Sequence, residues 1–123
     1  MNIVITLPSE LIRKIQRGEK QVEIRKFAPE SFYPSIDIVY ICEKRKSAIV
    51  AYLELTRIIR LRKELINVVR CARKAAIPMK RLLHNISSVQ YFYEWQIAVI
   101  TTLDTPIPIS KIDGLKKAPQ SYV

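Results

Sequence analysis

The spacing of the apolar residues changes twice along the chain, and this limits the folds that it can adopt. Apolar and polar residues alternate over residues 21–25, and runs rich in β-branched and aromatic residues follow at 36–42, 48–59 and 92–101. Such segments are typical of strands, and the longest of the first three, 48–59, is expected to bend or bulge. Over residues 65–72 the apolar positions instead recur at helical spacing. Strands with helices inserted between them, rather than alternating one for one, predict an α+β fold.

Prolines and glycines indicate where further elements begin and end. A short apolar strand over residues 3–5 precedes Pro8, after which we expect a helix. Gly18 can end that helix, because a residue without a Cβ adopts the left-handed conformation at no steric cost. Pro78 is expected to open a second short helix. Residues 104–123 contain three prolines and are expected to have little regular structure, although their isoleucines suggest that the segment packs down.

Length and composition favour a single globular domain over residues 1–123. Hydrophobic residues make up 49% and charged residues 26% of the 123 residues. No apolar run reaches the roughly 18 residues of a membrane-spanning helix, and no basic segment precedes the apolar start of the chain. Cys42 and Cys71 are too few for a disulfide scaffold and too far apart for a zinc knuckle, so both are expected to be reduced and buried. We therefore expect a cytoplasmic protein with no membrane association, no metal and no other cofactor.

The charge gives the first indication of function. Twenty-one Lys and Arg against eleven Asp and Glu give a formal net charge of +10. A positive field attracts polyanions, of which nucleic acids are the commonest in the cytoplasm. Candidate contacts to a nucleic-acid backbone are Lys44, Arg45 and Lys46 in an expected hairpin, and Arg62 and Lys63 at the start of a basic helix expected over residues 62–74. The alternative for both groups is a solvated face without a partner.

The charged residues around the alternating strand form a second candidate site. Glu23 and Arg25 share one face of this strand and lie about 7 Å apart, from the rise of about 3.3–3.4 Å per residue. Lys20 stands at the entrance of the strand. A carboxylate between two cations is expected to stay ionised, and it can accept hydrogen bonds from a base while the cations hold phosphate or carbonyl oxygens. The alternative is a row of surface ion pairs, which adds only about 0–1 kcal/mol.

Residues 18–25, GEKQVEIR, carry the complete pattern G-x-K-x-x-E-x-R. This pattern resembles the signature of the ASCH domain, a branch of the PUA-like superfamily. The hairpin over residues 38–54, the late strand at 95–99 and the ending APQSY at 118–122 follow in the same order as in that family. The resemblance implies a small PUA-like β-barrel with two or three helices packed on its outside. It also implies a cleft that binds RNA or a nucleotide, lined by Lys20, Glu23, Arg25, Lys26, Gln120 and Ser121.

The resemblance raises catalysis as an alternative, because some relatives hydrolyse acetylcytidine and a few are described as ribonucleases. The acetylcytidine hydrolases place a threonine nucleophile three residues after the lysine, and Glu23 fills that position here. A carboxylate is a poor substitute for a lysine-activated hydroxyl that attacks an amide carbonyl. An acid–base pair of Lys20 and Glu23 acting on a modified nucleoside or RNA is the remaining catalytic hypothesis.

Aromatic residues and the single histidine are further candidates. Phe27, Phe32 and Tyr33 lie in a proline-bearing loop and are placed to stack on bases. The aromatic group at residues 91–95 is expected to pack in the core instead. His84 has no neighbours that would make a metal site, so we expect it to be satisfied within the fold or to face solvent.

The leading hypothesis from the sequence is a non-catalytic module that binds single-stranded RNA or a nucleotide. Duplex DNA is less favoured because no segment resembles a recognition helix. One alternative is the hydrolase described above. The other is a protein-interaction module, such as an inhibitor or adaptor of a nucleic-acid enzyme, whose positive surface meets an acidic protein partner.

Overall fold

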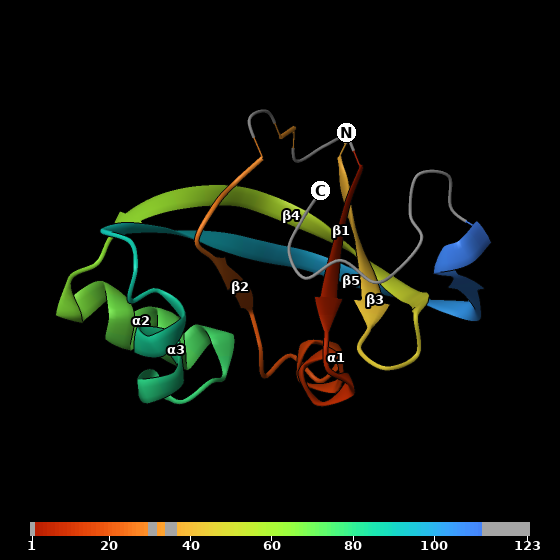
Figure 1. The fold of residues 1–123 in the computed structure, drawn as a ribbon, viewed down its shortest axis with the longest axis horizontal. Helices are drawn as coiled ribbons and strands as arrows, with labels where there is room; N and C mark the ends of the chain where they lie inside the picture. The colour runs from red at the N-terminus through yellow and green to blue at the C-terminus, as the bar shows by residue number, and fades with distance from the viewer. Residues whose placement is uncertain (1, 30–31, 34–36, 112–123) are drawn as a thin grey trace.

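The computed structural model of the chain describes residues 2–29, 32–33 and 37–111. The elements are, in order, β1 (Asn2–Leu7), α1 (Ser9–Gln16), β2 (Val22–Arg25), β3 (Ile38–Glu43), β4 (Ala48–Arg62), α2 (Leu65–Ala75), α3 (Met79–Asn85), β5 (Tyr91–Pro108) and the 3₁₀ turn η1 (Ile109–Lys111). The described part of the chain is therefore α+β, with its helices inserted between strands as the sequence predicts (Figure 1).

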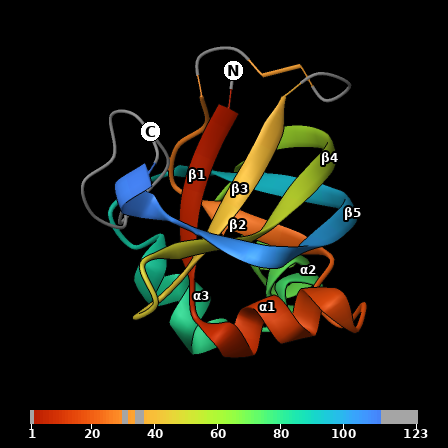
Figure 2. The same ribbon diagram turned by 90° about the vertical axis from the view of Figure 1, so that its right-hand side faces the viewer.

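The described strands form one mixed sheet in the order β1-β3-β4-β5-β2. β1 pairs with β3 in parallel, and the other neighbours are antiparallel. β1 and β2 are the two edges of this sheet, and no pairing within the described residues joins them. The sheet is strongly curled, as Figure 2 shows, but it is not closed into a barrel. The closed barrel expected from the sequence is therefore not confirmed, but the strong curl of the sheet is.

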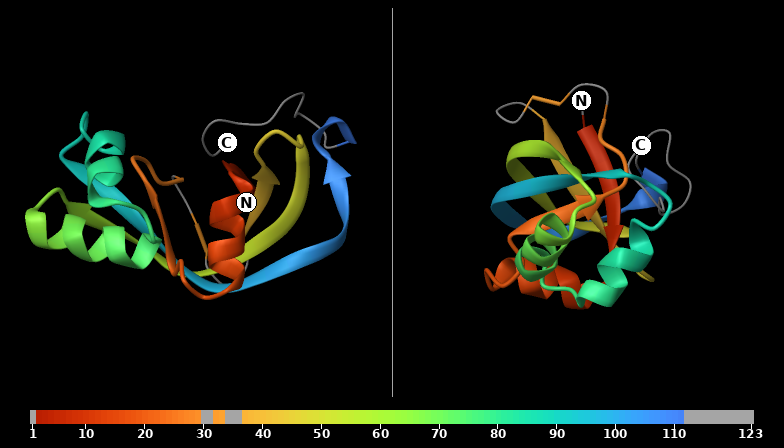
Figure 3. Two further views of the ribbon diagram at one scale, coloured as in Figure 1. Left: turned by 90° about the horizontal axis from the view of Figure 1, so that it is seen from below. Right: turned by 90° about the vertical axis from the view of Figure 1, so that its left-hand side faces the viewer.

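The long strands β4 and β5 give the sheet its curvature. Their pairing shifts register three times, between Ile49 and Ala51 and on both sides of Leu55. Each shift inserts extra residues that increase the local bend and twist. The bend or bulge predicted for residues 48–59 is therefore confirmed in β4. Seen from below in Figure 3 (left), β4 and β5 form one curved ribbon, with α2 and α3 at one end and η1 at the other.

The sequence places the end of the last strand too early. β5 continues through the segment that was expected to be irregular from Asp104, and Ile107 and Pro108 pair with Ile49 and Ala48 at the start of β4. Proline is tolerated here because β2 pairs with β5 only at residues 93–96, so among the described residues this part of β5 has no second neighbour that needs its N–H groups. Ile109 is buried as expected.

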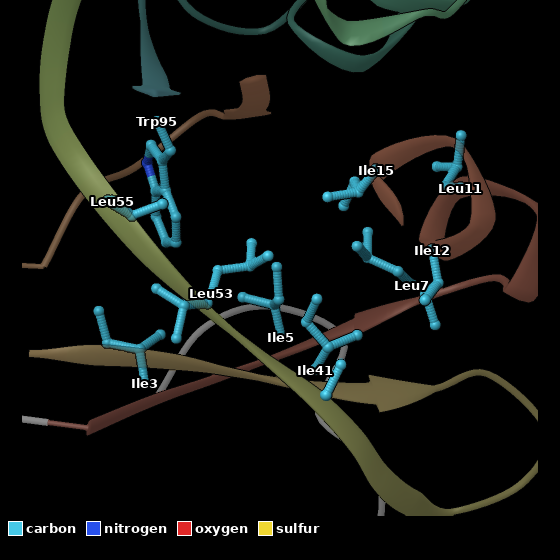
Figure 4. Close-up of a cluster of buried hydrophobic side chains, with 12 residues drawn as sticks. Ile3, Ile5, Leu7, Leu11, Ile12, Ile15, Ile41, Leu53, Leu55 and Trp95 are labelled. Atoms are coloured by element: carbon cyan, nitrogen blue, oxygen red, sulfur yellow. The ribbon is translucent and has the colours of Figure 1, made fainter. Parts of the chain in front are cut away.

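Packing in the concave side of the sheet explains the position of α1. Leu11, Ile12 and Ile15 of α1 are buried against Ile5, Leu53, Trp95 and their neighbours in the main core (Figure 4). The helix predicted after Pro8 and the predicted burial of Trp95 are confirmed. Tyr91, in the same aromatic group, is instead partly exposed, and the Arg60 guanidinium lies 4.0 Å from the centre of its ring.

A second apolar cluster lies beneath α2 and α3. It consists of Val68, Cys71, Ala72, Leu82, Ile86 and Phe92. Both cysteines are free and buried, as expected. In the part of the chain that the structure describes, none of the helices is long and apolar enough to span a bilayer.

Candidate ligand-binding site

A tight turn connects α1 to β2 and positions the charged motif. Gly18 adopts a φ of 77°, in the left-handed region where a side chain would be strained, and the predicted end of the helix is confirmed. The N–H groups of Glu19 and Lys20 both donate to the carbonyl of Lys14, at 2.9 and 3.1 Å. The chain therefore reverses within a few residues, and Lys20 points back toward the start of β2.

Three charged side chains of the motif form one ion network. Lys20 Nζ lies 3.1 Å from Glu23 Oε1, and Arg25 Nε donates to Glu23 Oε2 at 2.8 Å. Lys20 is only 3% exposed and Glu23 only 6%. The network is therefore buried, in contrast to the row of surface pairs that was the alternative from the sequence.

The electrostatic surroundings keep Glu23 ionised. Burial by itself would raise the pKa of this carboxyl, but the charges and hydrogen bonds of Lys20 and Arg25 outweigh it and hold the pKa below the ordinary value. The expectation that this carboxylate stays charged is confirmed. Each of its oxygens already accepts a hydrogen bond from a cation, which leaves further lone pairs for a ligand.

Lys20 also links the motif to the end of α2. Its ammonium donates to the carbonyl of Ala75 at 3.2 Å, and the N–H of Gln21 donates to the carbonyl of Lys74 at 2.7 Å. A cation at a helix C-terminus satisfies carbonyls that have no partner within the helix and interacts favourably with the helix dipole. Lys20 therefore positions Glu23 and anchors α2 at the same time.

A cavity of about 370 Å³ opens beside this network. Lys20, Glu23, Arg25 and Lys26 all line it, so the structure brings together the four described residues that the sequence proposed for a ligand. The rest of the lining comes from the β1–α1 junction, α2 and α3, and includes Thr6, Pro8, Leu11, Ile77, Arg81, Leu82 and Asn85. Gln120 and Ser121 lie outside the described residues. The volume is at the lower end of the range of about 300–1,000 Å³ for small-ligand pockets.

The sequence analysis missed the contribution of α3. Arg81 and Asn85 are four residues apart, and both line the cavity from one side of this helix. Their spacing was visible in the sequence, but only the packing of Leu82 and Ile86 into the second cluster decides which side faces the cavity.

Two of the predicted backbone contacts line a second cavity. Lys44 and Arg45 surround it together with Arg13, and its volume is about 380 Å³. It lies on the other side of α1 from the first cavity, and Pro8 lines both. This grouping of Arg13 with the hairpin could not be read from the sequence, because the residues are about thirty positions apart.

The other three predicted backbone contacts are engaged within the protein. Lys46 Nζ lies 2.9 Å from Glu43 Oε2, and Arg62 Nε lies 4.0 Å from Glu64 Oε1. Lys63 donates to two main-chain carbonyls that follow α3. None of the three lines either cavity. Their contact with a nucleic acid stays a prediction.

The remaining candidates lie elsewhere. Phe27 and Tyr33 are exposed, whereas Phe32 packs against the main core. His84 is exposed on α3. Among the described residues, no three His, Cys, Asp or Glu side chains come together in a way that could hold a metal. Burial raises the pKa of the Cys71 thiol to about 12, with a further contribution from Glu94, so this cysteine is not poised as a nucleophile.

Solved structures with the same architecture were found by comparison. The ASCH protein of Zymomonas mobilis superposes with a TM-score of 0.80 at 20% sequence identity, over 99% of this chain and 85% of that one. The chain has the ASCH fold. Serine-to-alanine and tyrosine-to-phenylalanine mutants of the Zymomonas protein superpose with TM-scores of 0.81 and 0.80, each at 20% identity and over 99% of this chain, covering 86% and 88% of those chains.

The resemblance of residues 18–25 to the ASCH signature already implied a cleft at the motif, and the cavity lies there. No protein-family model and no curated protein sequence matches the chain. The similarity to the Zymomonas structures, at this identity, concerns the fold.

Proposed function

We propose that this protein binds a nucleotide, or one nucleotide of a single-stranded RNA, in the cavity beside the ion network. The observation that carries this proposal is the buried, ionised Glu23 between Lys20 and Arg25 at the wall of that cavity. Burying three charges costs desolvation energy, which the protein recovers in part through their mutual attraction. A cavity that keeps such groups at its wall suits a polar ligand with both donors and acceptors.

The lining supplies complementary chemistry for the parts of a nucleotide. The Glu23 carboxylate accepts from an exocyclic amine or ring N–H of a base. Arg25 donates to Glu23 through Nε and makes no other hydrogen bond or ion pair with a described residue, so its terminal nitrogens can bond carbonyl or phosphate oxygens of a ligand. Lys26 and Arg81 add two exposed cations at the cavity. Pro8, Leu11 and Ile77 offer apolar surface for the faces of the base.

Two further observations favour RNA as the class of ligand. The formal net charge of +10 attracts polyanions. The PUA-like ASCH fold, with its curled sheet and no recognition helix, suits unpaired bases better than duplex DNA. No described group favours the hydrolase hypothesis, because the Lys20 ammonium already donates to both Glu23 and Ala75. The structure likewise offers no specific support for an acidic protein partner.

Fluorescence anisotropy with a labelled RNA hexamer of mixed sequence tests the proposal. Arg81→Gln removes one exposed cation from the cavity, and we expect it to weaken binding about tenfold, from the 1.5–3 kcal/mol typical of a hydrogen bond to a charged group. Glu23→Gln is expected to weaken binding without lowering the salt dependence, because the carboxylate contacts a base and no phosphate.

A matched control is available on α2. Arg70→Gln removes the same charge from an exposed helical position that lines neither cavity. If Arg70→Gln weakened binding as much as Arg81→Gln, the protein would only attract polyanions, and the proposed site would be wrong.

A further inference from the structure

The second cavity lies directly beside the proposed nucleotide site. α1 stands between the β3–β4 turn on one side and the α2–α3 pair on the other (Figure 1). The first cavity is lined in part by α3, and the second in part by the turn. Pro8, at the junction of β1 and α1, lines both cavities and separates them. The two cavities therefore meet at Pro8.

The second cavity carries an excess of unpaired positive charge. Arg13, Lys44 and Arg45 line it, and their side chains have no hydrogen bond or ion pair to any residue that the structure describes. Glu10 is its acidic lining residue, and that carboxylate lies 3.6 Å from Lys14 Nζ. The neighbouring Lys46, by contrast, is paired with Glu43. Three cations against one carboxylate, which is itself paired with Lys14, leave a net positive lining that suits an anion such as a phosphate.

The backbone of the β3–β4 turn positions two of these cations, Lys44 and Arg45. The N–H of Lys44 donates to the carbonyl of Leu7 at 2.8 Å, which ties the turn to the end of β1. Arg45 has a φ of 76°, in the left-handed region. Glycine or asparagine is usual there, and other residues cost stability. An arginine at this position therefore keeps a charge at the cavity at some cost to the fold.

We propose that the second cavity binds a phosphate of the RNA next to the nucleotide held in the first cavity. The protein then binds at least two adjacent nucleotides along a fixed path over Pro8. This inference rests on the proposed function, because it assigns the first cavity to a nucleotide. It adds that the favoured ligand is a continuous strand rather than a free nucleotide.

Two ligands distinguish the cavities. The four nucleoside 5′-monophosphates are titrated by calorimetry, and the labelled RNA hexamer by anisotropy. Arg45→Asn and Arg13→Gln are each expected to weaken hexamer binding about fivefold and to lower the salt slope by about 0.7, as for one lost phosphate contact on a single strand. Monophosphate binding should stay unchanged. Asparagine accepts a positive φ, so Arg45→Asn should fold at least as stably as the native chain.

A gain of affinity provides an independent test. Glu10 is the acidic group at the second cavity, and its side chain is 72% exposed. Glu10→Gln removes its repulsion of a phosphate and is expected to tighten hexamer binding about twofold, again with no effect on the monophosphates. The control Arg70→Gln should change hexamer binding less than either Arg45→Asn or Arg13→Gln.

The outcomes separate this inference from the proposed function. If Glu23→Gln weakens both ligands while Arg45→Asn, Arg13→Gln and Glu10→Gln leave the hexamer unaffected, the second cavity binds no phosphate and the inference is wrong. If the native protein binds neither ligand, the proposed function itself is wrong, and the path over Pro8 is excluded with it.

Discussion

Two buried carboxylates on neighbouring strands are held in opposite ways. Glu23 of β2 and Glu94 of β5 are 6% and 2% exposed. Glu23 lies between two cations. Glu94 instead accepts from the Cys71 thiol at 3.1 Å and from Gln96 Nε2 at 2.9 Å, both neutral donors.

The difference shows where this fold uses charge. Neutral donors are sufficient to satisfy a buried carboxylate, as Glu94 demonstrates by linking β5 to α2. The two cations beside Glu23 add a desolvation cost that packing alone does not require. Glu23 lines the first cavity and Glu94 does not. We therefore interpret the charged network as part of a binding site and the neutral one as part of the scaffold.

The largest expected effect that tests this comparison is on stability. Glu23→Gln leaves the Lys20 ammonium buried without a counter-charge, and we expect the free energy of unfolding to fall by about 3 kcal/mol, since breaking one side of a buried ion pair costs about 3–5 kcal/mol. Urea denaturation measures this. A loss below about 1 kcal/mol would mean that water or other groups stabilise the Lys20 ammonium without Glu23. The ion pair would then contribute little to the stability of the fold.

Acid should weaken the same network. The pKa of Glu23 is lowered in the folded protein, so its contribution to stability is complete above the ordinary glutamate value of 4.5 and is lost as the pH falls through the lower folded value. We expect the native chain to lose more stability than Glu23→Gln when the pH is lowered from 5 toward 3. Urea denaturation of both proteins across this range checks it. Parallel pH curves would contradict a charged Glu23 that stabilises the fold.

The smallest effect is expected at Glu94. Glutamine at this position can still accept from the Cys71 thiol with its carbonyl oxygen, and no cation is left without a partner. The free energy of unfolding should change by less than about 1.5 kcal/mol, the worth of a typical hydrogen bond. The same denaturation experiment decides it. A loss equal to that of Glu23→Gln would remove the distinction between the two carboxylates.

Local sequence patterns predicted the elements of the site but not its enclosure. The alternation over residues 21–25 correctly placed Glu23 and Arg25 on one face of a strand, and Gly18 correctly marked the turn before it. The pattern left open whether that face carries a ligand site or surface ion pairs. In the structure Glu23 is buried, and the half-buried Ile24 packs against the second cluster and also lines the cavity.

The missing information is long-range. The carbonyl that binds Lys20 comes from Ala75, fifty-five residues away, and Arg81 reaches the cavity only because α3 packs beside α2. Neither contact leaves a periodic signal in the sequence. The continuation of β5 past Asp104 was missed for the same reason, because its partner is the start of β4.

Cross-linking tests the central claim, that the first cavity holds a nucleotide of RNA, most directly. A hexamer containing 4-thiouridine is bound to the native protein and irradiated, and the cross-linked peptides are identified by mass spectrometry. The proposed site predicts cross-links to residues 20–26 and to α3, with loss of both in Arg81→Gln at a hexamer concentration that saturates only the native protein. Cross-links confined to the exposed apolar side of α2, at Leu65, Ile66 and Val69, would place the RNA elsewhere and contradict the account.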